Sequence, residues 1–412
     1  MSASTPTRAL PLPREAECPY APAPEVAVLR EESPVTRVVT PTGLDAWLVT
    51  RHADVREVLG DPVRFSNRPG QAAHVLAHLS PDKPIEAEEF SRMDGPEHLR
   101  FRRVFGPVVS MMKRVEDEYR PLVQRVVDER LDALAEKSEP IELHEEFSKP
   151  ITTAVIAELL GVPYAERGLF HRAAEALFSS VTGADEVSEK RESLTEYVGR
   201  LVAQRRAERG TDMLSRLITK GEQADPPMSD RELTAMGSGL LIAGYDTTAS
   251  VITYGTLALL QQGEQFAALR EDPSLAVNAT EELVRYLGVG IGLMREATRD
   301  TEIGGVPIAK GEFVIAAVQS ANHDPSQFTD PGRLDVTRST KGHLGFGHGP
   351  HQCVGQQIAR IELQSVLATL ARRVPSLRLA VPFEEIEFKR DTVVLGPARL
   401  PVTWDRVLPA QD

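Results

Sequence analysis

The chain has few cysteines, no long apolar run and no excess of basic residues. Only two of its 412 residues are cysteine, Cys18 and Cys353, which excludes a disulfide framework and suits a reducing compartment. No run of about eighteen apolar residues could cross a membrane, and the opening residues lack the apolar stretch of a signal peptide. A net charge of −13 without a basic domain argues against a nucleic-acid partner. We therefore expect a cytoplasmic protein without a membrane segment.

The composition allows a large core, because 41% of the residues are hydrophobic. No linker divides the chain, so we expect a proline-rich segment at residues 1–24 and a single domain at residues 25–412. Alternating apolar and polar side chains in residues 36–49 predict a β-hairpin. Helical apolar spacing predicts helices at residues 96–112, 116–135, 150–160, 165–178 and 186–207.

A long helix is predicted to begin after Ser229, which forms a capping box with Glu232. Its apolar pattern continues to about Gln262, which makes it long enough to cross the whole protein. Short strands are predicted at residues 301–308, at 313–318 and within 377–404. The expected fold class is therefore mainly α with small peripheral β-sheets.

The most informative segment is FGHGPHQCVG at residues 346–355. Its glycines can take positive φ and let backbone approach a flat cofactor. A predicted helix at residues 354–370 directs its first N–H groups at Cys353, which lowers the thiol pKa and suits a metal-bound thiolate. Two other interpretations are a small buried side chain beside turn glycines and a nucleophile paired with His351.

These ten residues match F-G-x-G-x-H-x-C-x-G at all six specified positions, and the chain here resembles the cytochrome P450 haem-thiolate monooxygenases. The resemblance implies the cytochrome P450 fold, with a long central helix and haem bound before the C-terminal helix. It also implies haem b whose iron is held by the thiolate of Cys353. Electron donation from the thiolate favours O–O cleavage.

The segment AGYDTT at residues 243–248 lies in the middle of the predicted long helix, although these residue types disfavour a helix. Threonine can bond back to a carbonyl one turn earlier, and glycine tolerates a widened turn, so the helix could open there and admit water. The segment resembles the family's A-G-x-D/E-T-T oxygen-binding motif. By that resemblance Asp246 relays protons, Thr247 hydrogen-bonds the oxygen species on the iron, and Ala243 and Gly244 leave room for dioxygen. The alternative, a polar turn on a surface helix, fits poorly with the apolar residues on both sides.

Glu282 and Arg285 form E-x-x-R on a helix predicted at residues 276–287. Such i, i+3 pairs are common and weak on a surface. Here the pair resembles the family's structural ion pair, which the resemblance completes with Arg333.

Haem carries two propionates that need cationic or donor partners when buried. His98 and Arg102 share one face of a predicted helix, and with Arg295 and His351 they stand at family positions for these partners. The resemblance assigns haem contacts to His98, Arg102, Ala243, Gly244, Thr247, Arg295, Phe346, Gly347, His351, Cys353, Gly355 and Ala359.

The resemblance maps substrate contacts to the segments 67–90 and 177–185 and to Leu240, Ala243, Val289, Gly290, Ile291, Gly292, Thr392, Val393 and Val394. Most are small or aliphatic, and none is charged. This indicates an apolar, roomy pocket for a large neutral molecule such as a macrolide, polyketide, terpenoid or steroid. The glycines could equally serve only to permit a bend.

The chain most resembles members of the actinobacterial branch of the family, which tailor natural products. The implied reaction inserts one atom of O2 into a C–H or C=C bond, giving hydroxylation or epoxidation. Nothing resembles a flavin or iron–sulfur domain, so the implied partners are a ferredoxin and an NAD(P)H-dependent ferredoxin reductase, with the enzyme a monomer. Two alternatives are a peroxide-driven peroxygenase and a non-catalytic haem sensor.

A local basic run contrasts with the acidic chain. Between Glu97 and Glu116 there are no acids, and the run holds Arg100, Arg102, Arg103, Lys113 and Arg114. The resemblance places this segment near the cysteine loop, where ferredoxin docks, with Arg102 turned inward to a propionate. The alternative is a solvated basic face without a partner.

Overall fold

The structure is a computed structural model, and it describes residues 8–10, 12, 19–40, 43–67, 90–290, 292–390 and 392–410. Its α-helices are α1 Pro24–Glu32, α2 His52–Gly60, α3 Gly95–Val109, α4 Met112–Arg114, α5 Arg120–Ala135, α6 Lys149–Leu160, α7 Arg167–Phe178, α8 Ala184–Ala207, α9 Met213–Glu222, α10 Asp230–Gln261, α11 Gly263–Glu271, α12 Ala276–Leu287, α13 Val318–Asn322 and α14 Gln356–Arg373. Two π-helical turns, η2 Val115–Tyr119 and η3 His144–Ser148, lead into α5 and α6.

The strands are β1 Arg8–Ala9, β2 Val35–Val39, β3 Asp45–Val49, β4 Phe65–Ser66, β5 Ile141–Glu142, β6 Leu293–Ala297, β7 Thr301–Ile303, β8 Val306–Ile308, β9 Phe313–Ala316, β10 Arg378–Leu379 and β11 Pro401–Thr403. They form a sheet of order β1-β2-β3-β9-β6-β4, a sheet of order β10-β11-β5, and the pair β7-β8. The first sheet joins strands from both ends of the chain, because β3 pairs in parallel with β9.

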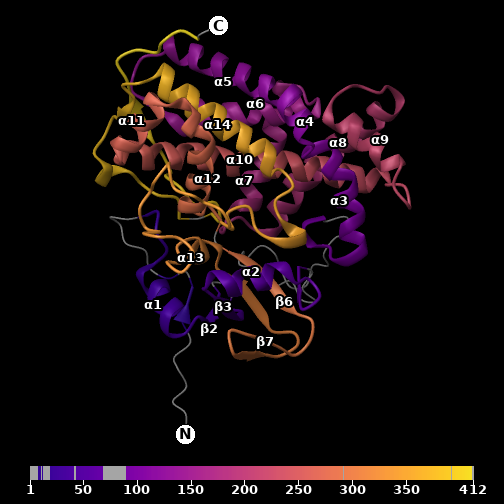
Figure 1. Ribbon diagram of the computed structural model, residues 1–412. Helices are drawn as coiled ribbons and strands as arrows, with labels where there is room; N and C mark the ends of the chain where they lie inside the picture. The colour runs from indigo at the N-terminus through magenta and orange to yellow at the C-terminus, as the bar shows by residue number, and fades with distance from the viewer. Residues whose placement is uncertain are drawn as a thin grey trace.

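Helices and sheet occupy different parts of the molecule (Figure 1). Helices α5, α6, α10 and α14 pack together as one block, and the large sheet lies below it with α1 and α2. The main apolar core fills the helical block, and a second cluster, which includes Val49, Phe65 and Val314, packs the sheet against α2. The expected mainly α class is confirmed, although the largest sheet has six strands.

Helix α10 begins at the predicted capping box, in which the Ser229 hydroxyl accepts from the Glu232 N–H and Glu232 accepts from the Ser229 N–H. It runs unbroken for 32 residues, and apolar side chains are buried on most of its sides, which is why it lies inside the molecule. The predicted long crossing helix is confirmed.

The hairpin predicted at residues 36–49 is confirmed as β2 and β3, with Val35 paired to Val49. The five predicted helices correspond to α3 and α5 to α8. Helices α1, α2, α4, α9, α11 and α13 were not predicted, because each has ten residues or fewer and gives too short a window for a periodic pattern. Cys18, Thr42, Ile291 and residues 68–89 lie outside the described residues.

Within the described ranges, no helix has the length and apolar character that a membrane span would require.

Candidate active site

A tight loop before α14 presents Cys353. The Cys353 N–H donates to the Phe346 carbonyl (2.8 Å), and the Gly347 N–H donates to the Leu344 carbonyl (2.8 Å). Gly347 has φ 75° and Gly349 has φ 71°, so both occupy the left-handed region that glycine favours. A side chain at Gly349 would also meet the Leu59 carbonyl at 2.6 Å, so α2 packs directly against the loop.

The helix following the loop begins at Gln356, with Gly355 at its N-cap and Ala359 one turn further. Burial raises the pKa of the Cys353 thiol, while N–H groups of Gly355 and Gln356 bond to the sulfur and act to lower it. The prediction of a net lowered pKa was therefore wrong for the protein without a bound cation, because desolvation outweighs these amides. Cys353 is nevertheless exposed, so a ligand can reach the sulfur.

A cluster of charged side chains packs against Phe346 and holds the cysteine loop in place. The Arg360 guanidinium lies 4.4 Å from the centre of the Phe346 ring. It donates to both oxygens of Glu281 (2.7 and 3.0 Å), and His343 Nε2 lies 2.9 Å from the same carboxylate. Although burial opposes the effect, these partners lower the pKa of Glu281 to about 2. Sequence reasoning missed Glu281, because a charge beside E-x-x-R carries no signal of its own.

Three of the predicted propionate partners meet beside the loop. The rings of His98 and His351 stack with centroids 4.1 Å apart, and His351 Nε2 lies 3.1 Å from Asp94 Oδ1. Arg102 donates to the Gln352 carbonyl (2.8 Å). Burial, with the nearby His351 and Arg102, lowers the pKa of His98 to about 4, so His98 is a neutral donor at pH 7.

The fourth partner, Arg295, is only 4% exposed on β6. It donates to Asn67 Oδ1 (2.6 Å) and to the Met294 carbonyl (2.8 Å), and Asn67 Nδ2 lies 3.5 Å from His351. Burial lowers the pKa of Arg295 to about 10, and Asp94 is the carboxylate that opposes this. Donors from α3, β6 and the cysteine loop thus converge with little negative charge among them, which fits a ligand that brings its own carboxylates.

One side of α10 is open although the helix is otherwise buried. Gly239 and Ala243 are exposed, one turn apart, and Thr247 is partly exposed. Gly244 is partly exposed too, but a side chain there would meet Ile156 at 3.2 Å, so Gly244 packs against α6 and does not belong to the open face. The Thr247 hydroxyl donates to the Ala243 carbonyl (2.7 Å), as predicted for a threonine in this motif. This open face of small residues leaves space for a flat group beside the helix. The helix itself does not break there.

The Asp246 carboxylate lies on a different side of α10 and is 8% exposed. Its Oδ1 is 3.8 Å from both His144 Nε2 and Lys389 Nζ. Neither partner was predicted, because the two lie about a hundred residues or more from Asp246 in the sequence and belong to no motif.

The predicted ion pair is present, and its third member is different. Arg285 donates to Glu282 at 2.7 and 2.8 Å, and both side chains are fully buried. The assignment of Arg333 was wrong: it is 64% exposed and lies 3.7 Å from Glu264. Arg338 takes the expected place, 3.2 Å from Glu282, because the chain turns after residue 335 and brings Arg338 back over the carboxylate.

Backbone contacts bring three predicted substrate segments together. Thr392 bridges to Ser179, the Val393 N–H donates to the Phe178 carbonyl (3.0 Å), and Val394 bridges to Gly290. The Leu395 N–H donates to the Val289 carbonyl (2.8 Å), which ties the same turn to the residues after α12. We call this junction of residues 178–179, 289–290 and 392–395 the wall. Leu240 and Val394 are buried, Ala243 and Gly290 are exposed, and Gly292 is partly exposed with φ 122°.

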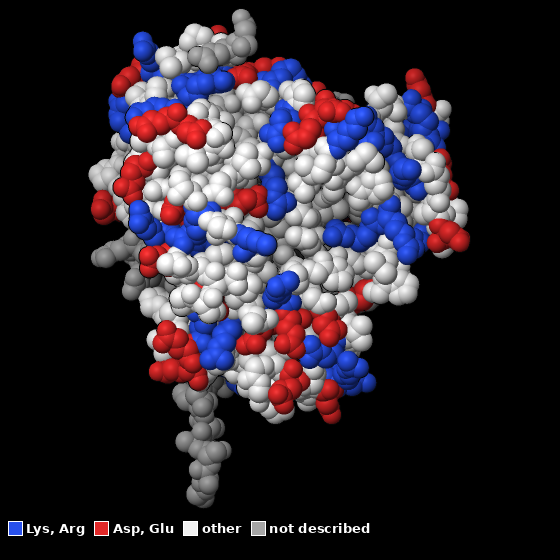
Figure 2. Space-filling model, in the orientation of Figure 1, with Lys and Arg blue, Asp and Glu red and all other residues white. Residues whose placement is uncertain are grey.

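The basic run is only partly free to meet a partner. Arg100 is bonded to Glu232, and Arg114 donates to the Pro107 carbonyl and lies 3.7 Å from Glu118, so these two charges already have partners within the chain. Arg103 and Lys113 are exposed. Positive side chains gather over the region of α3 and α4 on the face that Figure 2 shows.

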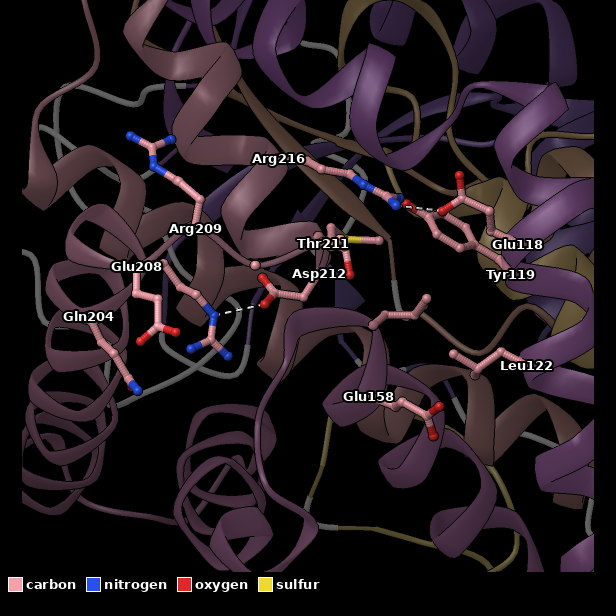
Figure 3. Close-up of a pocket in the computed structure, with 14 residues that line it drawn as sticks. Glu118, Tyr119, Leu122, Glu158, Gln204, Glu208, Arg209, Thr211, Asp212 and Arg216 are labelled. Carbon is pink, nitrogen blue, oxygen red and sulfur yellow. Dashed lines mark hydrogen bonds and ion pairs between the residues drawn. The ribbon is translucent and has the colours of Figure 1, made fainter.

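A separate cavity of about 610 Å³ lies among α5, α6, α8 and α9 (Figure 3). Its cations are already paired, with Arg216 2.6 Å from Glu118 and Arg205 2.7 Å from Asp212. It contains none of the predicted site residues, so its size alone does not make it the active site.

Comparison with known proteins agrees with this geometry. A family model described as Cytochrome P450 matches residues 170–400. The chain is 41% identical to Cytochrome P450-SU2 of Streptomyces griseolus over 96% of each chain, and 38% identical to pentalenic acid synthase of Streptomyces avermitilis over 95% of this chain and 96% of that one. The crystal structure of CYP105P1 in complex with filipin I superimposes with a TM-score of 0.91 at 41% identity, covering 97% of this chain and all of the other. The chain therefore belongs to the cytochrome P450 family and is a monooxygenase that uses haem with a cysteine thiolate ligand.

Proposed function

We propose that this protein inserts one oxygen atom from O2 into a C–H or C=C bond of a large, apolar natural product such as a macrolide, polyketide, terpenoid or steroid. The observation that carries the substrate class is the wall: apart from the aromatic Phe178, the residues that meet there are small, aliphatic or hydroxyl-bearing, and none is charged. Relatives with assigned chemistry include pentalenic acid synthase and mycinamicin IV hydroxylase/epoxidase. A wall of this kind suits shape-based binding of a bulky neutral molecule.

Cys353 would hold the haem iron as a thiolate, since it is an exposed cysteine just before α14 with two amides bonded to its sulfur. When bound, the haem supplies the activation of dioxygen and the transfer of its oxygen. The amides and the nearby Arg102 would stabilise the negative sulfur and moderate its electron donation.

His98, Arg102, Arg295 and His351 would bind the propionates. Arg295 would provide a full charge, and His98 a neutral N–H. Asp94 orients His351 by accepting from its Nε2, which fixes the position of the imidazole.

Thr247 would act as the hydroxyl that holds a proton at the open face of α10, with the Ala243 carbonyl fixing its rotamer. Asp246 would pass protons towards it from the buried polar cluster that it forms with His144 and Lys389 beside the open face. The apolar neighbours of α10 exclude bulk water, so protons would arrive by this route rather than from free solvent.

Electrons would come from a ferredoxin and its NAD(P)H-dependent reductase. Arg103 and Lys113 would form the positive part of the docking surface, with the exposed Met111 and Met112 beside them. Replacing either cation by Glu should slow reduction by ferredoxin at low salt and have little effect at high salt, because screening removes a steering field. Equal stopped-flow rates at low salt would exclude this surface.

Two experiments test the proposal. The Cys353→His protein should lose the red-shifted carbon monoxide band of reduced thiolate-bound haem, and persistence of that band would refute the ligand assignment. Spectral titration with filipin I, mycinamicin VIII and a set of steroids and terpenoids should then identify binders, and product formation should be measured with ferredoxin and with hydrogen peroxide. Turnover with peroxide alone would favour a peroxygenase, and binding without NAD(P)H-linked product would favour a haem sensor.

A further inference from the structure

A buried polar cluster lies next to the open stripe of α10, because Asp246 is one residue before Thr247 and three residues after Ala243 on the same unbroken helix. It contains Asp246, His144 and Lys389, whose side chains are 12%, 3% and 17% exposed. The Lys389 ammonium lies 3.8 Å from the carboxylate, 3.2 Å from Ser250 Oγ and 3.4 Å from His144 Nε2. Three titratable groups therefore share one buried volume, and their charges must depend on one another.

The hydrogen bonds indicate which group carries the positive charge. Burial, together with nearby lysines, lowers the pKa of His144 to about 2, so the imidazole is neutral. An ammonium can only donate, so His144 Nε2 accepts from Lys389 and His144 Nδ1 donates to Thr253 Oγ1 (2.9 Å). Because His144 Nε2 carries no proton, it cannot donate to Asp246 and brings no positive charge. Among the described residues, Lys389 is therefore the cation in contact with the Asp246 carboxylate.

The other lysine nearby is already bonded elsewhere. Lys149 Nζ lies 2.5 Å from Glu145 and 3.6 Å from Glu175, so its charge is taken up by surface carboxylates. Burial lowers the pKa of Lys389, and the Asp246 carboxylate is the main group that opposes this shift. Lys149 acts on Lys389 only at longer range and adds to the lowering, while Glu145 and Glu142 oppose it.

The contact between Lys389 and Asp246 is an ion pair and not a hydrogen bond. At 3.8 Å it exceeds hydrogen-bond range, whereas the structural pair Glu282 and Arg285 is closed at 2.7 Å with both partners fully buried. A charge contact at this distance orients the carboxylate without locking its rotamer. Such a carboxylate can turn when its cation moves.

Lys389 belongs to the same hairpin that forms the wall. Its N–H donates to the Gly396 carbonyl (2.9 Å), Phe388 bridges to Pro397, and the Ala398 N–H donates to the Glu387 carbonyl (2.7 Å). The turn of this hairpin, residues 392–395, makes the backbone bonds to residues 178–179 and 289–290. Only a few residues therefore separate the wall from the ammonium that contacts Asp246.

We propose that Lys389 is a positioning residue for Asp246, and that the hairpin formed by residues 387–389 and 396–398 transmits occupancy of the wall to this carboxylate. A molecule lying against the wall would displace the turn, shift Lys389 and change the orientation of Asp246. Proton delivery would then become efficient only when substrate is present. The inference rests on the proposed function, because it assumes that Asp246 delivers protons.

The first experiment measures proton delivery through NADPH consumption by the haem-loaded enzyme with spinach ferredoxin and its reductase, in H2O and D2O, without added substrate. Lys389→Met should change the rate of NADPH consumption by at least about fivefold and alter its solvent isotope effect, because acid–base steps contribute about a hundredfold or more to a rate. Lys389→Arg keeps the positive charge and should restore most of the rate and of the isotope effect. Lys310→Met, a change at an exposed lysine, is the matched control and should behave as wild type.

Epistasis separates this inference from the proposed function. In an Asp246→Asn protein, Lys389→Met should change the rate by less than about twofold, because residues that act through one another are not additive. A persistent effect of Lys389→Met in that background would overturn the positioning role. If Asp246→Asn alone leaves rate and isotope effect unchanged, the proton-delivery role of Asp246 fails and this inference fails with it.

The second experiment does not depend on turnover. If ligand binding at the wall alters the contact between Lys389 and Asp246, then removing that contact must alter the affinity of a ligand that lies against the wall, because coupling between two sites is reciprocal. Clotrimazole, a bulky azole whose nitrogen binds haem iron, is the probe, and its Kd from spectral titration should differ by at least about fivefold between wild type and Lys389→Met. An unchanged Kd, with Lys310→Met also unchanged, would overturn the transmission through the hairpin.

Discussion

Arg295 offers a prediction in which the haem-free and haem-loaded proteins respond in opposite ways. Burial lowers the pKa of its guanidinium from 12.5 to about 10, which at about 1.36 kcal/mol per pKa unit corresponds to about 3.4 kcal/mol against the charged form. Because the pKa is lowered, this cost is present at every pH below about 10, and pH 7 lies well inside that window. A haem propionate beside Arg295 would recover this energy.

Arg295→Met should therefore weaken haem binding by about two to three powers of ten, since 1.4 kcal/mol is a factor of ten. The haem-free variant should melt no lower than haem-free wild type, since losing the bonds to Asn67 and Met294 offsets only part of the relieved cost. The assay is the rate of haem transfer to apomyoglobin, with circular dichroism melting of the haem-free proteins beside it. Arg299→Met, at an exposed position nearby, is the control. Equal transfer rates for Arg295→Met and wild type would refute the reasoning.

Three further predictions concern other groups. Thr247→Ala should keep haem but release more peroxide per NADPH, measured by peroxide assay, because a hydroxyl that holds a proton is lost; unchanged peroxide yield would contradict this. Arg338→Met should cost about 1.5–3 kcal/mol and lower the temperature at which haem absorbance is lost. Arg333→Met should not, because of these two arginines only Arg338 reaches buried Glu282. Burial raises the pKa of Glu362 well above 4.5, so its folded carboxyl holds a proton and wild-type stability should fall as pH rises above about 4.5. Glu362→Gln should remove that decline in melting profiles, and parallel pH profiles would contradict it.

Local motifs allowed the long helix, the cysteine loop and the propionate donors to be predicted, because each depends on residues close together in the sequence or on a family pattern. Arg338 was mistaken for Arg333 because the path of the chain after residue 335 decides which arginine reaches Glu282, and no local pattern encodes that path. Lys389 and His144 could not be predicted for the same reason. Their environment exists only after distant segments fold against α10.

The pairing of β3 with β9 sets the order in which the protein can be completed during synthesis. β2 and β3 can form their hairpin as soon as they leave the ribosome, but the other edge of β3 must wait for residues 313–316. Until then that edge offers unpaired N–H and C=O groups to any other strand. The cysteine loop, which packs on α2, emerges later still, so haem can be enclosed only when the chain is nearly finished. If translation slows or stops before residue 313, the N-terminal fragment should therefore be prone to aggregation and depend on chaperones. That fragment cannot yet retain haem.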